Sequence, residues 1–239
     1  MTASDRNARI AGLLYLLVII AAPVRLVYIP MRLFVTDDTG ATMSNILAHE
    51  GLFRLGIFSD LLTGVLMLFL TLAFYRLFAQ VDRTLATLTV ILGGVLQAAI
   101  YFFNVLNDAA VLLIARGPDF LSVFDKPQRD ALALLFLKLH GQEIGAAMVL
   151  WGLWLVPLAL LIFRSPFLPK IFGWGLALNG VAYLAQSITW SVLPQFDDVV
   201  TGISAPLQFV EILFMLWLLV FGARRSLRRP PATLPAASI

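Results

Sequence analysis

The sequence predicts an all-α fold: a polytopic membrane protein whose six transmembrane helices form one bundle, with the N and C termini cytoplasmic. Of its 239 residues, 60% are hydrophobic and 13% are charged, whereas soluble domains contain about 45–50% apolar residues. The mean hydropathy is +0.91. Six apolar runs, each long enough to cross a bilayer as a helix, are separated by short polar breaks and leave no length for a separate soluble domain.

The first predicted span covers residues 10–33 and follows a basic N-terminal segment. A cleaved signal peptide is the alternative, because the apolar run reaches the small pair Ala21-Ala22. The apolar character resumes after Arg25, however, and this favours a span that is retained.

The next three predicted spans cover residues 54–78, 85–115 and 131–163. Polar, glycine and proline residues interrupt the chain between consecutive spans. The third and fourth spans are longer than a bilayer is thick, so we expect them to tilt or to project beyond it. Before the second span, residues 42–50 have helical spacing and a plausible cap at Thr42, which predicts a short helix at the membrane surface.

The last two predicted spans cover residues 170–193 and 207–223, with a proline-bounded link from Pro194 to Pro206 between them. Residues 1–224 therefore form a single membrane domain. Residues 225–239 are predicted to form a polybasic, then proline-rich cytoplasmic tail without ordered structure. We expect the basic residues that begin this tail to bind anionic lipid headgroups; they are Arg224, Arg225, Arg228 and Arg229.

Lysine and arginine are unevenly shared between the two sets of loops. Ten flank the spans on the side of the termini, at positions 6, 9, 76, 83, 164, 170, 224, 225, 228 and 229, and five flank them on the opposite side, at positions 32, 54, 116, 126 and 129. The positive-inside rule then places both termini in the cytoplasm. The net charge of +3 is explained by this uneven distribution of lysine and arginine, and we expect no nucleic-acid partner. The chain has no cysteine, which excludes disulfides and thiolate chemistry.

Seven ionisable residues fall within the predicted spans. A charge near the bilayer centre costs about 2.5–3.5 kcal/mol on insertion scales, so such residues usually face the interior of the bundle and pair. Counted from the predicted span ends at 1.5 Å per residue, they share the extracytoplasmic half of the membrane. We therefore expect one polar pocket there. The seven are Arg25, Asp60, Asp108, Lys138, His140, Glu143 and Glu211.

Helical periodicity supports this pocket. Gln97, Tyr101, Asn104 and Asp108 follow i, i+4, i+7 and i+11, which is one face of a helix. His140 and Glu143 share a face of the fourth span, whereas Lys138 can extend to water from another face. The predicted ligand-binding set is Arg25, Asp60, Asn104, Asp108, His140, Glu143 and Glu211.

The seven ionisable residues include two positive and four negative side chains, a formal charge of −2 if His140 is neutral. A low-dielectric pocket does not tolerate that charge unassisted, which predicts a bound proton, cation or small polar ligand, for transport or sensing. An intramembrane enzyme using the same His/Asp/Glu cluster and a purely structural charge network are the alternatives. No catalytic residue can be assigned. Because the other histidine, His49, lies in a loop, we expect no metal site and no cofactor.

Three blocks of the chain resemble the recurring motifs of a known family. They are "NILAHEGLFRLGIFSDLL" at 45–62, "LALLFLKLHGQEIG" at 132–145 and "RSPFLPKIFG" at 164–173. In this order they are similar to a family of bacterial multispanning membrane proteins known as domain of unknown function 4386, and the likeness extends from about residue 8 to 224.

In the family pattern an acidic residue follows the "RLGI" block, here Asp60, and a His-Gly pair closes the "LH" block, here His140-Gly141. Where the pattern has an acid before that pair, this chain has Lys138. The resemblance implies a multi-pass protein of the bacterial cytoplasmic (inner) membrane, whose main partner is the lipid bilayer. It implies no activity.

Overall fold

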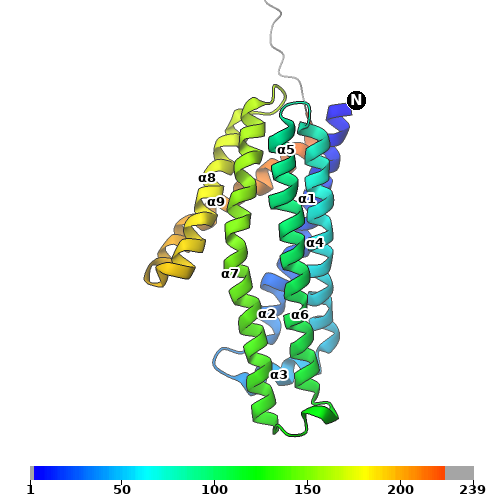
Figure 1. The fold of residues 1–239 in the computed structure, drawn as a ribbon, viewed down its shortest axis with the longest axis vertical. Helices are drawn as coiled ribbons and strands as arrows, with labels where there is room; N and C mark the ends of the chain where they lie inside the picture. The colour runs from blue at the N-terminus through cyan, green and yellow to red at the C-terminus, as the bar shows by residue number, and fades with distance from the viewer. Residues whose placement is uncertain (1–2, 224–239) are drawn as a thin grey trace, which may run out of the picture.

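The computed structural model describes residues 3–223 and confirms the all-α, six-span prediction (Figure 1). The arginines predicted to contact lipid headgroups, at 224, 225, 228 and 229, and the tail over 225–239 lie outside the described residues. Within those residues six helical segments are long and apolar enough to cross a membrane: Ser4–Leu33, Glu50–Phe78, Arg83–Arg116, Lys126–Arg164, Lys170–Val192 and Pro194–Val220.

Two of these segments contain a wider π-helical turn. The first consists of α1 (Ala3–Pro23), the π turn η1 (Val24–Tyr28) and α2 (Ile29–Leu33), and the third of α5 (Arg83–Val90), the π turn η2 (Ile91–Val95) and α6 (Leu96–Arg116). Proline has no N–H to donate, so the regular ladder cannot continue unchanged after Pro23. A π turn with one extra residue follows it and buries Arg25.

The remaining elements complete the bundle. Long helices form the second, fourth, fifth and sixth spans, namely α4 (Glu50–Phe78), α7 (Lys126–Arg164), α8 (Lys170–Val192) and α9 (Asp197–Val220). A short helix, α3 (Thr39–Ala48), precedes α4, and single 3-10 turns precede α7 and α9: η3 (Asp119–Leu121) and η4 (Pro194–Phe196). We call the end of the bundle with α3 and the α6–α7 connection the α3 end, and the end with the N-terminus the terminal end (Figure 1).

Most helices begin at residues other than the predicted ones, and two of these differences, in the short helix and the last helix, have identifiable causes. The short helix begins at Thr39, because Asp38 rather than Thr42 caps it by accepting a 2.8 Å hydrogen bond from the Ala41 backbone N–H. The last helix begins at Asp197, ten residues before the predicted start at 207. Two acidic residues in its first turn suit the positive end of the helix dipole but lower the local hydropathy, which hides the start from an apolar-run criterion.

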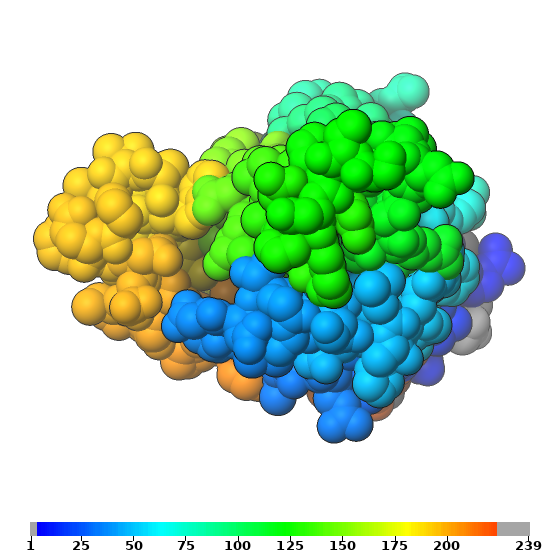
Figure 2. Space-filling model, turned by 90° about the horizontal axis from the view of Figure 1, so that it is seen from below, coloured from blue at the N-terminus to red at the C-terminus, as the bar shows by residue number. Residues whose placement is uncertain are grey.

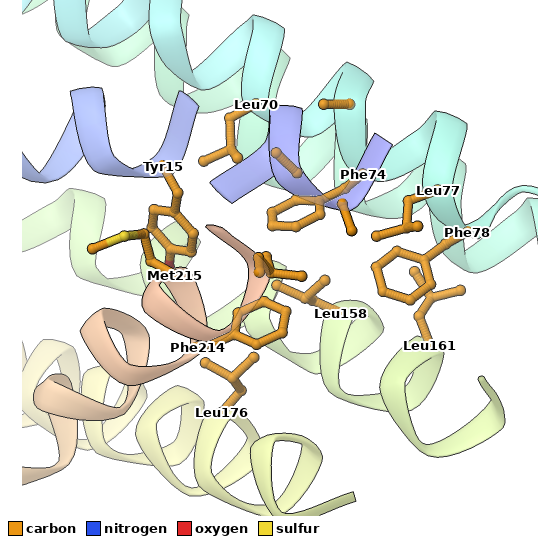
Figure 3. Close-up of a cluster of buried hydrophobic side chains, with 14 of the residues drawn as sticks. Tyr15, Leu70, Phe74, Leu77, Phe78, Leu158, Leu161, Leu176, Phe214 and Met215 are labelled. Carbon is orange, nitrogen blue, oxygen red and sulfur yellow. The ribbon is translucent and has the colours of Figure 1, made fainter. Parts of the chain in front are cut away.

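Two apolar cores fill the bundle at different levels. The terminal core joins α1, α4, α7 and α9 through large buried side chains such as Phe74, Phe78, Leu158 and Phe214 (Figure 3). The smaller α3-end core lies among α2, α3, α4, α6 and α7, around Met43 and Phe53. A polar layer separates the two cores.

Helices α8 and α9 form a hairpin that stands to one side of the other helices (Figures 1 and 2). Close contact holds α8 to the long helix α7, since a Cβ added to Gly152 would lie 2.7 Å from the carbonyl oxygen of Gly180. Near the terminal end α9 packs equally closely on α1, where a Cβ on Gly12 would lie 2.6 Å from the Leu219 nitrogen. Away from that end, α1 and α9 border a cavity.

Candidate functional site

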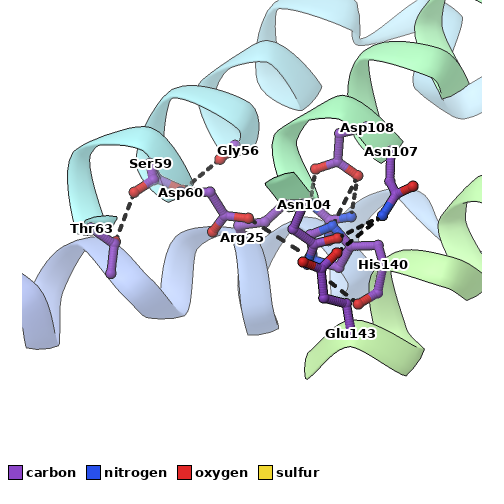
Figure 4. Close-up of polar contacts among 10 residues, drawn as sticks. All are labelled: Arg25, Gly56, Ser59, Asp60, Thr63, Asn104, Asn107, Asp108, His140 and Glu143. Carbon is purple, nitrogen blue, oxygen red and sulfur yellow. Dashed lines mark hydrogen bonds and ion pairs between the residues drawn. The ribbon is translucent and has the colours of Figure 1, made fainter. Parts of the chain in front are cut away.

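An ion pair between Arg25 and Asp108 forms the centre of the polar layer (Figure 4). The Arg25 Nε and Nη2 groups donate hydrogen bonds of 2.6 Å each to the two carboxylate oxygens of Asp108. The two side chains are 3% and 0% exposed. The guanidinium also lies 5.7 Å from the ring centroids of Phe34 and Phe53, a distance at which cation–π attraction operates. Arg25 is therefore fixed by the π turn, by Asp108 and by the α3-end core.

His140 and Asp60 complete this layer from α7 and α4. The His140 Nδ1 atom is 3.2 Å from Asp108 Oδ1, and its Nε2 atom is 4.0 Å from Asp60 Oδ2. Both residues are buried, and His140 Nδ1 is engaged by the Asp108 carboxylate. Nε2 of His140 and Oδ1 of Asp60 make no hydrogen bond to another described residue. A buried polar atom without a hydrogen bond destabilises the fold. A ligand that bonds to Nε2 of His140 and Oδ1 of Asp60 would remove this cost.

Amide groups on α6 connect the layer to Glu143. Asn104 donates a 3.3 Å hydrogen bond to the backbone carbonyl of His140, which joins α6 to α7. Asn107 donates to Asn104 Oδ1 at 3.0 Å and to Glu143 Oε2 at 3.3 Å. Glu143 is half-buried at the edge of the site (Figure 4). Sequence reasoning missed Asn107, although its i+3 spacing from Asn104 could have indicated it.

The structure thus brings together five predicted site residues, Arg25, Asp60, Asn104, Asp108 and His140, with Glu143 joined through an amide. A cavity of about 10 Å³ lies against Asp60, Asn104 and His140, and Gln97 and Tyr101 also line it. That volume is about the space of one water molecule. Asp60, Asp108 and His140 each offer a ligand atom within 4.8 Å of the others, so the three could also hold a metal ion.

Glu211 is not part of this cluster, which corrects the prediction of a single pocket. It lies 14 residues into α9 instead of four, and its carboxylate accepts hydrogen bonds from Tyr15 and, at 2.8 Å, from Asn179. Tyr15 precedes Arg25 by ten residues along the first span, so the two sites differ in depth by roughly 15 Å. The error came from the hidden start of α9, which made Glu211 look close to a span end.

A larger cavity of about 290 Å³ surrounds Glu211 and Tyr15. It adjoins the small one, since Leu26, Gln97, Tyr101 and Trp151 line both. Beyond Glu211 the terminal core closes the bundle with tightly packed aromatic and aliphatic side chains (Figure 3). The polar region therefore extends from the layer of Arg25, Asp60, Asp108 and His140, which we call the Arg25 layer, to mid-depth of the bundle, where it ends.

The uncharged length of α7 sets the depth of the site in the bilayer. Between Glu143 and Arg164 the helix has 20 uncharged residues, 144–163, or roughly 30 Å at 1.5 Å per residue, which equals the usual thickness of the hydrocarbon core. The Arg25 layer therefore lies at the edge of the hydrocarbon core nearer the α3 end. Lys138, beyond that edge, is exposed, as expected for a side chain that extends to water.

Comparison with known proteins gives one match. The family model described as Domain of unknown function (DUF4386) matches residues 10–222. No curated protein and no solved structure matches the chain.

Proposed function

The chain belongs to the DUF4386 family, and we propose that this multi-pass membrane protein binds one water-sized cation, in the first place a proton, between Asp60 and His140. The observation that carries the proposal is a cavity of about 10 Å³ lined by Asp60 and His140, whose Oδ1 and Nε2 atoms respectively are buried without a hydrogen bond. A substrate larger than water has no room there, which argues against catalysis by the same cluster.

Charge balance favours a proton. Arg25 and Asp108 neutralise each other through two hydrogen bonds, so the ionised Asp60 carboxylate leaves one negative charge in a buried layer. A single proton, on Asp60 or on the adjacent imidazole, removes it. A buried charge without compensation costs several kcal/mol, and this cost is the driving force for proton binding.

Binding or sensing is better supported than transport. A transported ion needs a route through both halves of the bundle, and the terminal core closes one half with Phe74, Trp154, Phe214 and their neighbours. We place the termini in the cytoplasm of a bacterial cell and the site toward the outside of the inner membrane. Arg76, Arg83 and Arg164 flank the spans at the terminal end, in keeping with the positive-inside rule. The predicted binding of anionic headgroups by the basic tail is part of the same proposal.

A metal ion is the second candidate, because Asp60, Asp108 and His140 present a mixed nitrogen and oxygen ligand set that suits Zn²⁺ or Mn²⁺. Against it, Arg25 already occupies both oxygens of Asp108 and would repel a divalent ion. Asp108 would then have to accept hydrogen bonds from Arg25 and coordinate the metal ion at the same time.

The test is the pH dependence of thermal unfolding for the purified protein in dodecylmaltoside. A native state that binds a proton more tightly than the unfolded chain gains stability as pH falls. We expect this rise in the wild type, its loss in Asp60→Asn and His140→Gln, and its retention in the exposed control Asp119→Asn. Infrared spectroscopy should show the carbonyl band of a buried protonated carboxyl if the proton is on Asp60.

Two results would count against the proton. Identical pH curves for the wild type and both site variants would rule out titration at this site. A stabilisation by Zn²⁺ or Mn²⁺ that chelation reverses, and that Asp60→Asn abolishes, would assign the site to a metal ion instead.

A further inference from the structure

We infer that the cavity beside Glu211 binds an organic ammonium ion that enters from the lipid layer between α1 and α9. This inference rests on Glu211 and its surroundings and does not depend on proton binding at Asp60. It concerns a second binding site, roughly 15 Å deeper along the first span.

The charge of the cavity calls for a cation. Both carboxylate oxygens of Glu211 accept hydrogen bonds from neutral donors, the Tyr15 hydroxyl and the Asn179 amide. These bonds hold the carboxyl group in place and bring no positive charge to it. Among residues 3–223, no lysine, arginine or histidine forms an ion pair with Glu211. The cation that balances it must therefore come from a ligand or a proton.

The walls of the cavity select an organic cation over a metal ion. Five aromatic side chains line it: Tyr15, Tyr101, Trp151, Trp154 and Tyr183. Trp151 and Tyr183 meet edge to face with centroids 5.7 Å apart, and Tyr15 and Trp154 do so at 6.2 Å. Aromatic walls around one carboxylate are the arrangement that recognises alkylammonium groups through cation–π attraction, whereas a metal ion needs several oxygen or nitrogen ligands.

Size and opening indicate how the ligand enters. The volume of about 290 Å³ is near the lower limit for small-molecule sites, enough for a head group and a short part of a chain. The lining residues that retain exposure include Ile19 and Pro23 on α1 and Gln208 and Ile212 on α9. The cavity thus opens between α1 and α9 at the depth of the hydrocarbon core, where the rest of an amphiphile would remain in lipid.

The experiment uses the full chain in dodecylmaltoside with octyltrimethylammonium as the probe, followed by unfolding temperature and by tryptophan fluorescence. The probe should raise the unfolding temperature in a saturable manner, while octyl sulfate and 1-octanol, which share the chain length, should not. Glu211→Gln should weaken the affinity roughly 10-fold or more, because it removes a partly desolvated charge pair. Asp119→Asn, which alters an exposed carboxylate outside this cavity, is the control and should bind normally.

A second variant keeps the test decisive if Glu211→Gln does not fold. Trp151→Leu removes one aromatic wall and leaves the carboxylate in place, so it should weaken binding roughly 3-fold or more. Unchanged affinity in the folded variants, or equal stabilisation by octyl sulfate, would overturn the inference. Asp60→Asn separates the two sites: it should abolish the pH response proposed above and still bind the probe.

Discussion

Arg25→Met is the most informative single perturbation, because it removes one partner of a fully buried ion pair. The variant loses two 2.6 Å hydrogen bonds to the Asp108 carboxylate, each worth about 1.5–3 kcal/mol when a charged group is involved. Truncating one side of a buried pair costs about 3–5 kcal/mol. We therefore expect the free energy of unfolding to fall by about 3–5 kcal/mol, or roughly 6–20 °C in unfolding temperature for a chain of this size.

A double-mutant cycle separates this penalty from the loss of packing. Asp108→Leu alone should cost a similar amount, since it leaves Arg25 charged and buried. Removing both charges eliminates the unpaired partner, so the double variant should be more stable than either single variant. The measurement is reversible unfolding of the four proteins in mixed micelles of dodecylmaltoside and dodecyl sulfate.

An exposed ion pair provides the control for this cycle. Arg54 lies in such a pair with Glu50, so Arg54→Met should leave the stability nearly unchanged. Additive effects of the Arg25 and Asp108 variants to within about 0.5 kcal/mol would refute the reasoning, because independent side chains would then account for the data. A loss below about 1 kcal/mol for Arg25→Met would refute it as well.

Three further predictions test packing, electrostatics and topology. Gly152→Ala should lower the unfolding temperature measurably, since its Cβ would lie 2.7 Å from a carbonyl oxygen of α8, whereas Gly141→Ala, with nothing within 4 Å, should not. Asp82 caps α5 by accepting a hydrogen bond from the Leu85 N–H and pairs with Arg164, and both hold its pKa below the ordinary 3.8; the stabilising effect of its charge is therefore present above that pH and lost below it. Asp82→Asn should accordingly be less stable than the wild type near pH 7, and the difference should shrink below about pH 4. With no native cysteine, Val123→Cys should react with an impermeant maleimide in intact cells and Ser4→Cys only after lysis; the reverse pattern would invert the proposed topology.

The Arg25 layer could be predicted from sequence because a charged side chain within the membrane is stable only in the interior of the bundle. Arg25, Asp60, Asp108 and His140 lie on four different spans, and the cost of exposing each to hydrocarbon directs all of them to the interior. Polar breaks mark the ends of these spans clearly, so the depth of each residue could be calculated from its distance along the chain to a span end. Counting residues could not predict which side chains pair with each other. The π turn after Pro23 changes the direction in which Arg25 points.

The sequence indicated Glu211 as a binding residue, but its position in a separate site could not be predicted, for a different reason. Tyr15 lies in an apolar run where a tyrosine usually indicates packing, and nothing local distinguishes one that binds a carboxylate 196 residues away. The depth of Glu211 depended on the start of α9, which acidic residues and Pro206 disguise as a loop. Hydropathy records where a helix enters lipid, and a helix that begins outside the lipid gives no such signal.

The separation of the two sites has an energetic consequence. A proton at Asp60 or His140 and a cation at Glu211 would both be positive charges, roughly 15 Å apart along the first span. With an effective dielectric constant of about 20, their repulsion is about 1 kcal/mol, a change in affinity of roughly fivefold. Because such coupling is reciprocal, protonation of the outer layer would weaken cation binding at mid-depth, and a bound cation would weaken proton binding to the same extent. Gln97 and Tyr101 line both cavities, so the two sites are neighbours in the bundle, and this coupling would let them act together as a pH-dependent ligand sensor.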